Sequence, residues 1–92
     1  MLSIKFTTQF KKDFKREKKG AHAADVAALL KGATDVLVGG QALDAAYKDH
    51  PLKGDWKGWR DCHLKPDLVL IYCMTEDALE LGRIGSHSEL FG

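Results

Sequence analysis

Residues 58–84 read GWRDCHLKPDLVLIYCMTEDALELGRI, and this stretch decides the fold. It contains three runs rich in β-branched, aromatic and other apolar residues, over residues 58–64, 68–74 and 79–84. Turn-forming residues separate the runs, as KPD between the first pair and TED between the second. Strands joined by turns this short have to be antiparallel. The second half of the chain therefore predicts a three-stranded antiparallel meander.

The residues before the meander predict one strand and two helices. Residues 2–6 alternate apolar and polar side chains, which is the pattern of a half-buried strand. Two phenylalanines four positions apart in a lysine-rich segment predict an amphipathic helix over residues 9–19. Apolar residues then recur with helical spacing up to Gly39, which predicts a second helix over residues 22–38. The order β-α-α-β-β-β indicates an α+β domain, with two helices on one face of a small, mainly antiparallel sheet and the other face free.

The composition fits a single domain spanning residues 1–92. No apolar run approaches the ~20 residues that cross a bilayer, and the first residues lack the features of a signal peptide. We therefore expect a soluble, cytoplasmic protein with no membrane partner. Cys62 and Cys73 lack metal-ligand spacing, and we expect both to be buried thiols. The histidines show no zinc-ligand spacing, so we expect neither a metal nor another cofactor.

Charge is distributed unevenly along the chain. The net charge is +1, but residues 1–20 carry a net charge of +5 and the remaining residues a net charge of −4. A lysine run on a helix is most often a solvated face, so this segment alone assigns no partner. Five further cations gather in the middle of the chain, namely Lys48, Lys53, Lys57, Arg60 and Lys65. Local positive charge of this kind attracts RNA, while the low total charge predicts a modest salt-dependent affinity.

Three histidines of the second half are candidates for proton transfer, namely His50, His63 and His87. Asp67 follows His63 by four positions across the first turn, and hairpin geometry predicts that the two side chains meet. A carboxylate beside an imidazole fixes the tautomer of the ring. With Arg83 and the lysines near residue 50 as phosphate-binding cations, this set suits cleavage of an RNA phosphodiester without a metal.

The same residues also have structural interpretations, which the sequence leaves open. A histidine at a strand end is often a satisfied surface or core residue. Trp56, Trp59 and Tyr72 are expected to be packing residues, and His22 is expected to be solvated. Phe91 either stacks on a nucleobase or fastens the C-terminal tail to the sheet. Residue parity does not decide which face a side chain uses, because a shift of one residue in register turns a strand over.

A longer pattern narrows these alternatives. Residues 47–67 read YKDHPLKGDWKGWRDCHLKPD, and residues 83–92 read RIGSHSELFG. Together they closely resemble the YafQ toxins, a branch of the RelE/ParE superfamily of bacterial type II toxin–antitoxin systems. The detailed resemblance covers residues 47–92, and the order of the elements extends it over the whole chain. Leu68 stands where a bulkier aromatic residue is common in these toxins, which leaves the codon preference open.

The resemblance implies a RelE-like fold and a ribosome-dependent endoribonuclease, which enters the vacant A site of the 70S ribosome and cuts the mRNA there. The catalytic residues that it implies are His50, His63, Asp67 and His87. His87 would act as the general acid, and His50 or His63 would take the 2′-hydroxyl proton while Asp67 orients its neighbour. Arg83 matches a position that holds the scissile phosphate, and Phe91 one that aligns a base. The further cations expected to bind the substrate are Lys48, Lys53 and Arg60.

The resemblance also implies partners. It predicts a DinJ-like antitoxin, which we expect to cover the exposed sheet face or the basic helix of residues 9–19, and it predicts contact with operator DNA only through that antitoxin. Two other functions stay open on the sequence. The same fold acts in the ParE branch by poisoning DNA gyrase without hydrolysis, and a degenerate module would bind the antitoxin alone.

Overall fold

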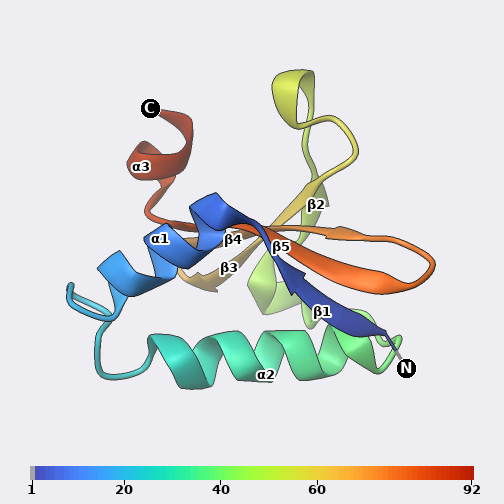
Figure 1. Ribbon diagram of the computed structural model, residues 1–92, viewed down its shortest axis with the longest axis horizontal. Helices are drawn as coiled ribbons and strands as arrows, with labels where there is room; N and C mark the ends of the chain where they lie inside the picture. Colours follow the sequence, from blue (N-terminus) through green and yellow to red (C-terminus); the bar gives the residue numbers. More distant parts are fainter. Residues whose placement is uncertain (1) are drawn as a thin grey trace.

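The structure, a computed structural model, describes residues 2–92, and its centre is a five-stranded sheet (Figure 1). The strands are β1 (Ser3–Phe6), β2 (His50–Pro51), β3 (Arg60–Lys65), β4 (Leu68–Met74) and β5 (Ala78–Gly85). Their order in the sheet is β1-β5-β4-β3-β2, with β1 parallel to β5 and the other neighbours antiparallel. The predicted mainly antiparallel sheet is confirmed. The strand β2 is an addition, because two residues are too few to show an alternating pattern.

The described residues also form three α-helices and two short 3-10 helices. They are α1 (Thr8–Glu17), α2 (Val26–Val38), η1 (Ala45–Tyr47), η2 (Gly54–Trp56) and α3 (His87–Phe91). The predicted α+β class is confirmed, but α2 begins later than its periodicity predicts, because residues 21–25 form turns and the buried face starts only at Val26. The prediction also lacks α3, although Ser86 and Glu89 form a capping box, a motif that marks the start of a helix.

Both faces of the sheet are covered. On the first face, α2 and Phe10 of α1 pack against the strands. This first core consists of Phe10, Val26, Leu30, Ala33, Leu37, Cys62, Leu64, Leu68, Leu70, Tyr72, Leu79, Leu81 and Ile84. A second, smaller core consists of Val69, Ile71 and Leu90 with Leu52, Trp56, Trp59 and Phe91 packed against it. The expectation of a free second face is therefore wrong, since residues 52–59 and α3 cover part of it.

The two cysteines differ in their surroundings. Cys62 is fully buried, as predicted, and burial raises the pKa of its thiol to about 12. Cys73 is only half-buried, so the prediction of a buried thiol is wrong for this residue. Tyr72 packs in the first core as predicted, and its hydroxyl donates a 2.7 Å hydrogen bond to Asp49. The buried hydroxyl of the core thus has a partner, as buried polar groups require.

Side chains of α1 and of its N-cap residue hydrogen-bond to the backbone of β5 where β1 does not pair with it. β1 has four residues and β5 has eight, so half of β5 has no strand on this side. The Thr7 hydroxyl donates to the Gly82 carbonyl at 2.8 Å, and the Ile84 amide donates to Asp13 at 3.3 Å. Arg16 donates to the Ile84 carbonyl at 3.2 Å. The edge of β5 therefore finds its hydrogen bonds in helix side chains, which fixes α1 relative to the sheet.

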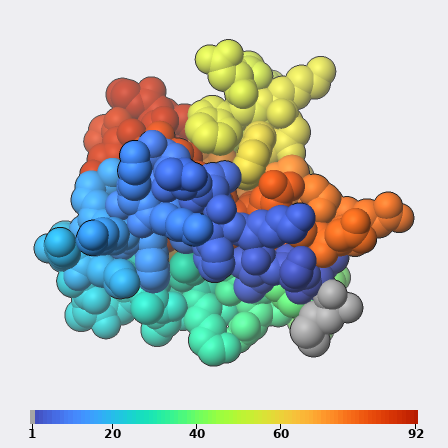
Figure 2. Space-filling view, in the orientation of Figure 1, coloured from blue at the N-terminus to red at the C-terminus, as the bar shows by residue number. Residues whose placement is uncertain are grey.

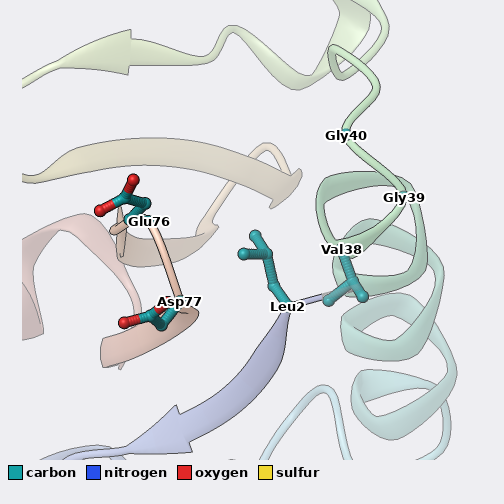
Figure 3. Close-up of a pocket in the computed structure, with 6 residues that line it drawn as sticks. All are labelled: Leu2, Val38, Gly39, Gly40, Glu76 and Asp77. Atoms are coloured by element: carbon teal, nitrogen blue, oxygen red, sulfur yellow. The ribbon is translucent and has the colours of Figure 1, made fainter.

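β1 is an outer strand of the sheet, and two hollows lie along it. Ile4 is 39% exposed and Phe6 is 49% exposed, so the prediction of a half-buried strand is wrong for its apolar side chains. These two residues, with Ala27 and Leu30 of α2, line a hollow of about 320 Å³. Beside Leu2, a second hollow of about 630 Å³ lies between the end of α2 and the acidic turn before β5 (Figure 3). Neither hollow is lined by a histidine.

Candidate active site

The strand register places two histidines and an aspartate on the second face of the sheet. His50 of β2 is the direct partner of Asp61 of β3, and Asp61 is the partner of Ile71 of β4. His63 lies two residues beyond Asp61 and is the partner of Val69. Directly opposed residues share a face of a sheet. These side chains therefore lie on the face of Val69 and Ile71, where the second core is.

The helix α3 carries the third histidine. Gly85 ends β5, Ser86 caps α3, and His87 is the first residue of that helix. The ring centroids of His87 and Phe91 are 4.8 Å apart. Phe91 packs against the second core, so it fastens the tail to the sheet, as one of its two sequence interpretations expects. In the space-filling view, the C-terminal residues (red) stand beside the loop that precedes β3 (yellow), above α1 (Figure 2).

Asp61 has a buried carboxylate that contacts His50. The residue is 3% exposed, and its Oδ1 lies 2.9 Å from His50 Nδ1. The same Nδ1 lies 2.9 Å from the Lys48 carbonyl oxygen, to which it donates the aligned hydrogen bond, so Asp61 Oδ1 has no hydrogen bond of regular geometry within residues 2–92. Because both neighbours of Nδ1 are acceptors, Nδ1 holds the hydrogen and Nε2 is the acceptor of the neutral ring. This tautomer is the one that a general base at Nε2 requires.

All three imidazoles lie within electrostatic reach of Asp61. Burial raises the pKa of the Asp61 carboxyl above its ordinary value, and the charges of His50, His63 and His87 act in the opposite direction. Asp61 is a further candidate for this site, which is absent from the residues expected from the sequence. Its signal is its place two residues before His63, because alternate residues of a strand share a face.

The expected pairing of His63 with Asp67 is wrong. Asp67 Oδ1 lies 3.3 Å from His22 Nε2, while His63 Nδ1 lies 3.3 Å from the Pro66 carbonyl oxygen. The ladder between β3 and β4 shifts register between His63 and Lys65, and Asp67 lies in the turn beyond it, with a side chain that is 73% exposed. The prediction of a solvated His22 is also wrong, because its side chain is 13% exposed.

Both arginines that we expected to bind phosphate are held by carboxylates. Arg83 donates to Asp13 from Nε at 2.7 Å and from Nη2 at 3.1 Å. Arg60 donates to Asp49 from Nε at 3.2 Å and from Nη2 at 3.4 Å. Burial of Asp13 opposes its ionisation, but the hydrogen bonds from Arg83 and neighbouring donors outweigh burial and hold the pKa of Asp13 below its usual range. Each guanidinium is fixed in place, and its Nη1 makes no hydrogen bond to the described residues.

Lys48 and Lys53 are the exposed cations of the predicted set. Neither forms an ion pair with any residue from 2 to 92. Lys48 also has a left-handed backbone conformation, with φ of 51°, at the turn where its carbonyl accepts the hydrogen bond from His50. Its side chain and its carbonyl therefore serve different purposes, the first as a cation and the second as an anchor for the imidazole.

The described part of the chain contains no group of three or more histidine, cysteine, aspartate or glutamate side chains arranged to hold a metal ion. None of its helices combines the length and the apolar character needed to cross a membrane.

Comparison with known proteins shows the family of the chain. A family model described as a bacterial toxin of type II toxin–antitoxin system, YafQ, matches residues 2–92. The mRNA interferase toxin YafQ of Escherichia coli strain K12 is 42% identical over 89 residues, which cover 97% of this chain and 95% of that protein.

Solved structures match over the whole chain as well. The crystal structure of YafQ from E. coli strain BL21(DE3) superposes with a TM-score of 0.88 at 39% identity, and 100% of both chains is covered. The toxin in the crystal structure of the E. coli DinJ–YafQ complex gives a TM-score of 0.86 at 40% identity, again with 100% of both chains covered.

Proposed function

Because the chain belongs to the YafQ family of bacterial type II toxins and is an mRNA interferase, we propose that it cuts messages on the 70S ribosome, in the vacant A site. The observation that supports this most strongly is the group of three histidines around buried Asp61. Cleavage of RNA by its own 2′-hydroxyl needs a base, an acid and stabilisation of the phosphate. The site has candidates for all three.

The proposed proton transfers use His50 as the base and His87 as the acid. Nε2 of His50 takes the proton of the 2′-hydroxyl, because Lys48 and Asp61 hold the hydrogen of this ring on Nδ1. The 2′-oxygen attacks phosphorus, and His87 protonates the departing 5′-oxygen. The products are a 2′,3′-cyclic phosphate and a 5′-hydroxyl. His63 is the alternative base, on the same face of β3 as Asp61.

The remaining residues of the site bind the substrate. Lys48 and Lys53 face solvent and attract the phosphates, while Arg83 and Arg60 offer one fixed nitrogen each. Phe91 fastens the tail but is only half-buried, so its exposed part, beside His87, is available to align the base next to the scissile bond. Asp67 is exposed and contacts His22, so we do not assign it to orienting His63.

The test uses ribosomes programmed with a message whose A site is vacant. The purified protein is expected to cut at the A-site codon, as read by primer extension, and to leave the same RNA intact without ribosomes or with tRNA in the A site. Equal cleavage of free RNA would contradict ribosome dependence. Uncut message in growth-arrested cells, together with DNA breaks in the presence of gyrase, would instead support the gyrase poison.

We further propose that an antitoxin similar to DinJ binds the groove along β1, and that contact with operator DNA occurs only through it. The E. coli relative is found in a DinJ–YafQ complex, and in this chain the free edge of β1 carries the exposed side chains of Ile4 and Phe6. A free strand edge beside an apolar hollow suits an extended peptide segment. Of the two surfaces expected from the sequence, the second sheet face is already covered in part, which leaves the basic side of α1. The edge of β1 is a third surface, which only the structure reveals.

Replacing both Ile4 and Phe6 with alanine is expected to weaken antitoxin binding at least about tenfold, because buried apolar anchors dominate such interfaces. Lys5→Ala is the matched control, since alternate residues of β1 face opposite sides. Isothermal titration with the cognate antitoxin measures both. Parent-like affinity in the double variant would show that the antitoxin binds elsewhere.

A further inference from the structure

The helix α3 carries His87 and Phe91, but it is too short to hold its own position. It has five residues, and isolated helices of this length are not stable in water. Its capping box joins Ser86 and Glu89, and its apolar contacts with the second core are the buried side chain of Leu90 and the half-buried ring of Phe91. The position of His87 therefore depends on what fastens α3 to the rest of the protein.

Arg16 of α1 adds a polar connection between α3 and the rest of the protein. Its Nε lies 3.0 Å from Glu89 Oε2, while its Nη2 donates to the Ile84 carbonyl at 3.2 Å. The same guanidinium donates to Asp13 at 3.2 Å and to Glu17 at 3.1 Å. One side chain thus joins α1, β5 and α3. Glu89 takes part in both the capping box and the contact with Arg16, because its Oε1 accepts a hydrogen bond from the Ser86 amide at 2.8 Å while its Oε2 faces Arg16.

Gly85 makes room for this contact. A Cβ atom on residue 85 would lie 2.8 Å from Arg16 Nη2, 3.2 Å from Glu89 Oε1 and 3.4 Å from a Leu90 methyl carbon. The guanidinium therefore lies against the bare backbone at the end of β5. The environment of Glu89 agrees, because the hydrogen bond from the Ser86 backbone, with the charge of Arg16 among the smaller causes, lowers the pKa of its carboxyl.

We propose that Arg16 is a positioning residue, which clamps α3 to α1 and β5 and so holds His87 over the site. The part of this proposal that concerns cleavage rests on the proposed function. The mechanical part concerns α3 alone. It needs no substrate, so it is tested separately.

Hydrogen exchange tests the clamp in the free protein. The Glu89 amide donates to Ser86 Oγ and the Leu90 amide to the Ser86 carbonyl, so both report the first turn of α3. Arg16→Gln is expected to speed their exchange roughly two- to fivefold, the range of a partly exposed ion pair. Glu89→Gln keeps an acceptor for the Ser86 amide, and its α3 amides are expected to exchange as fast as those of Arg16→Gln. The double variant is expected to exchange no faster than the faster single variant.

Two more variants separate the clamp from charge and from folding. Lys15→Gln removes one positive charge from the same turn of α1 without touching α3, and its α3 amides are expected to exchange as in the parent. Gly85→Ala keeps every charge but forces the Arg16 guanidinium to move, so its α3 amides are expected to exchange faster. Parent-like exchange in a folded Arg16→Gln protein, or equal acceleration in Lys15→Gln, would overturn the clamp.

Cleavage on programmed ribosomes then tests the consequence for His87. Arg16→Gln is expected to lower the rate at saturating ribosomes about two- to fivefold with an unchanged half-saturating concentration, and Arg16→Lys to recover part of the rate. A change in half-saturation alone would assign Arg16 to ribosome binding and overturn its positioning role. If the parent does not cut but α3 exchange responds as described, the clamp stands and the proposed function fails.

Discussion

Replacing His87 with alanine is expected to lower the single-turnover cleavage rate on programmed ribosomes by about 10²- to 10⁴-fold, the usual contribution of a positioned general acid. The 5′-oxygen is a poor leaving group unless it is protonated as its bond to phosphorus breaks. The parent is expected to show a bell-shaped pH profile. Its alkaline limb reports deprotonation of the acid, so the variant is expected to lose that limb.

Ser88→Ala is the matched control for this experiment. Ser88 is an exposed neighbour on the same helix, and its hydroxyl lies 3.3 Å from Ser86 Oγ. The two hydrogen bonds of the capping box run between Ser86 and Glu89, so they do not require the Ser88 hydroxyl. It is expected to retain the parental rate and pH profile. A His87→Ala protein that keeps the alkaline limb would show that another group protonates the leaving oxygen.

Asp61→Asn is expected to lower the cleavage rate about 10- to 100-fold. The amide no longer balances the positive charge that forms on His50 as it takes a proton. The loss stays well below the ~10⁴-fold seen when an imidazole is held in the wrong tautomer, because the Lys48 carbonyl still accepts the hydrogen of Nδ1. Single-turnover cleavage measures the loss, and a parental rate would remove Asp61 from the mechanism.

The same substitution is expected to stabilise the fold at neutral pH. Burial raises the pKa of Asp61 above 3.8, so the folded state binds this proton more tightly than the unfolded state does. Protonated Asp61 contributes this stability in full below pH 3.8. The contribution is lost as the pH rises through the pKa of Asp61 in the folded state. Asparagine carries no charge, so its advantage in the free energy of unfolding is expected only above that range. Urea unfolding at pH 3.5 and pH 7 checks this, and a variant less stable at pH 7 would contradict it.

The sequence predicted the meander and the α+β class because their signals are local. Alternation, short turns and apolar spacing depend on neighbouring residues alone. The candidates His50, His63 and His87 can also be named from the sequence, because the imidazole is a group that transfers protons near neutral pH. The start of α3 has a local signal as well, because Ser86 and Glu89 show the spacing of a capping box.

The partners of these residues could not be predicted in the same way. A regular hairpin predicts that Asp67 meets His63, but the register shift before Lys65 leaves Asp67 in the turn, beside His22. The place of Asp61 two residues before His63 predicts that the two share a face, but its contact with His50 depends on the register between β2 and β3. The ion pairs of the arginines could not be predicted either, because the carboxylate that binds Arg83 is 70 positions away in sequence. Contacts of this kind depend on the whole fold.

The pairing of β1 with β5 has a consequence for the synthesis of the toxin. Ser3 donates a hydrogen bond to Asp77, 74 positions later, so β1 has no strand beside it until residues 78–85 have been made. Pairings this distant form late in folding, and translation adds roughly 5–20 residues per second. α3 follows β5, so the nuclease site assembles after every strand of the sheet has been translated. A partly synthesised chain therefore lacks the complete site, and the groove along β1 proposed for the antitoxin is also completed only once β5 is in place.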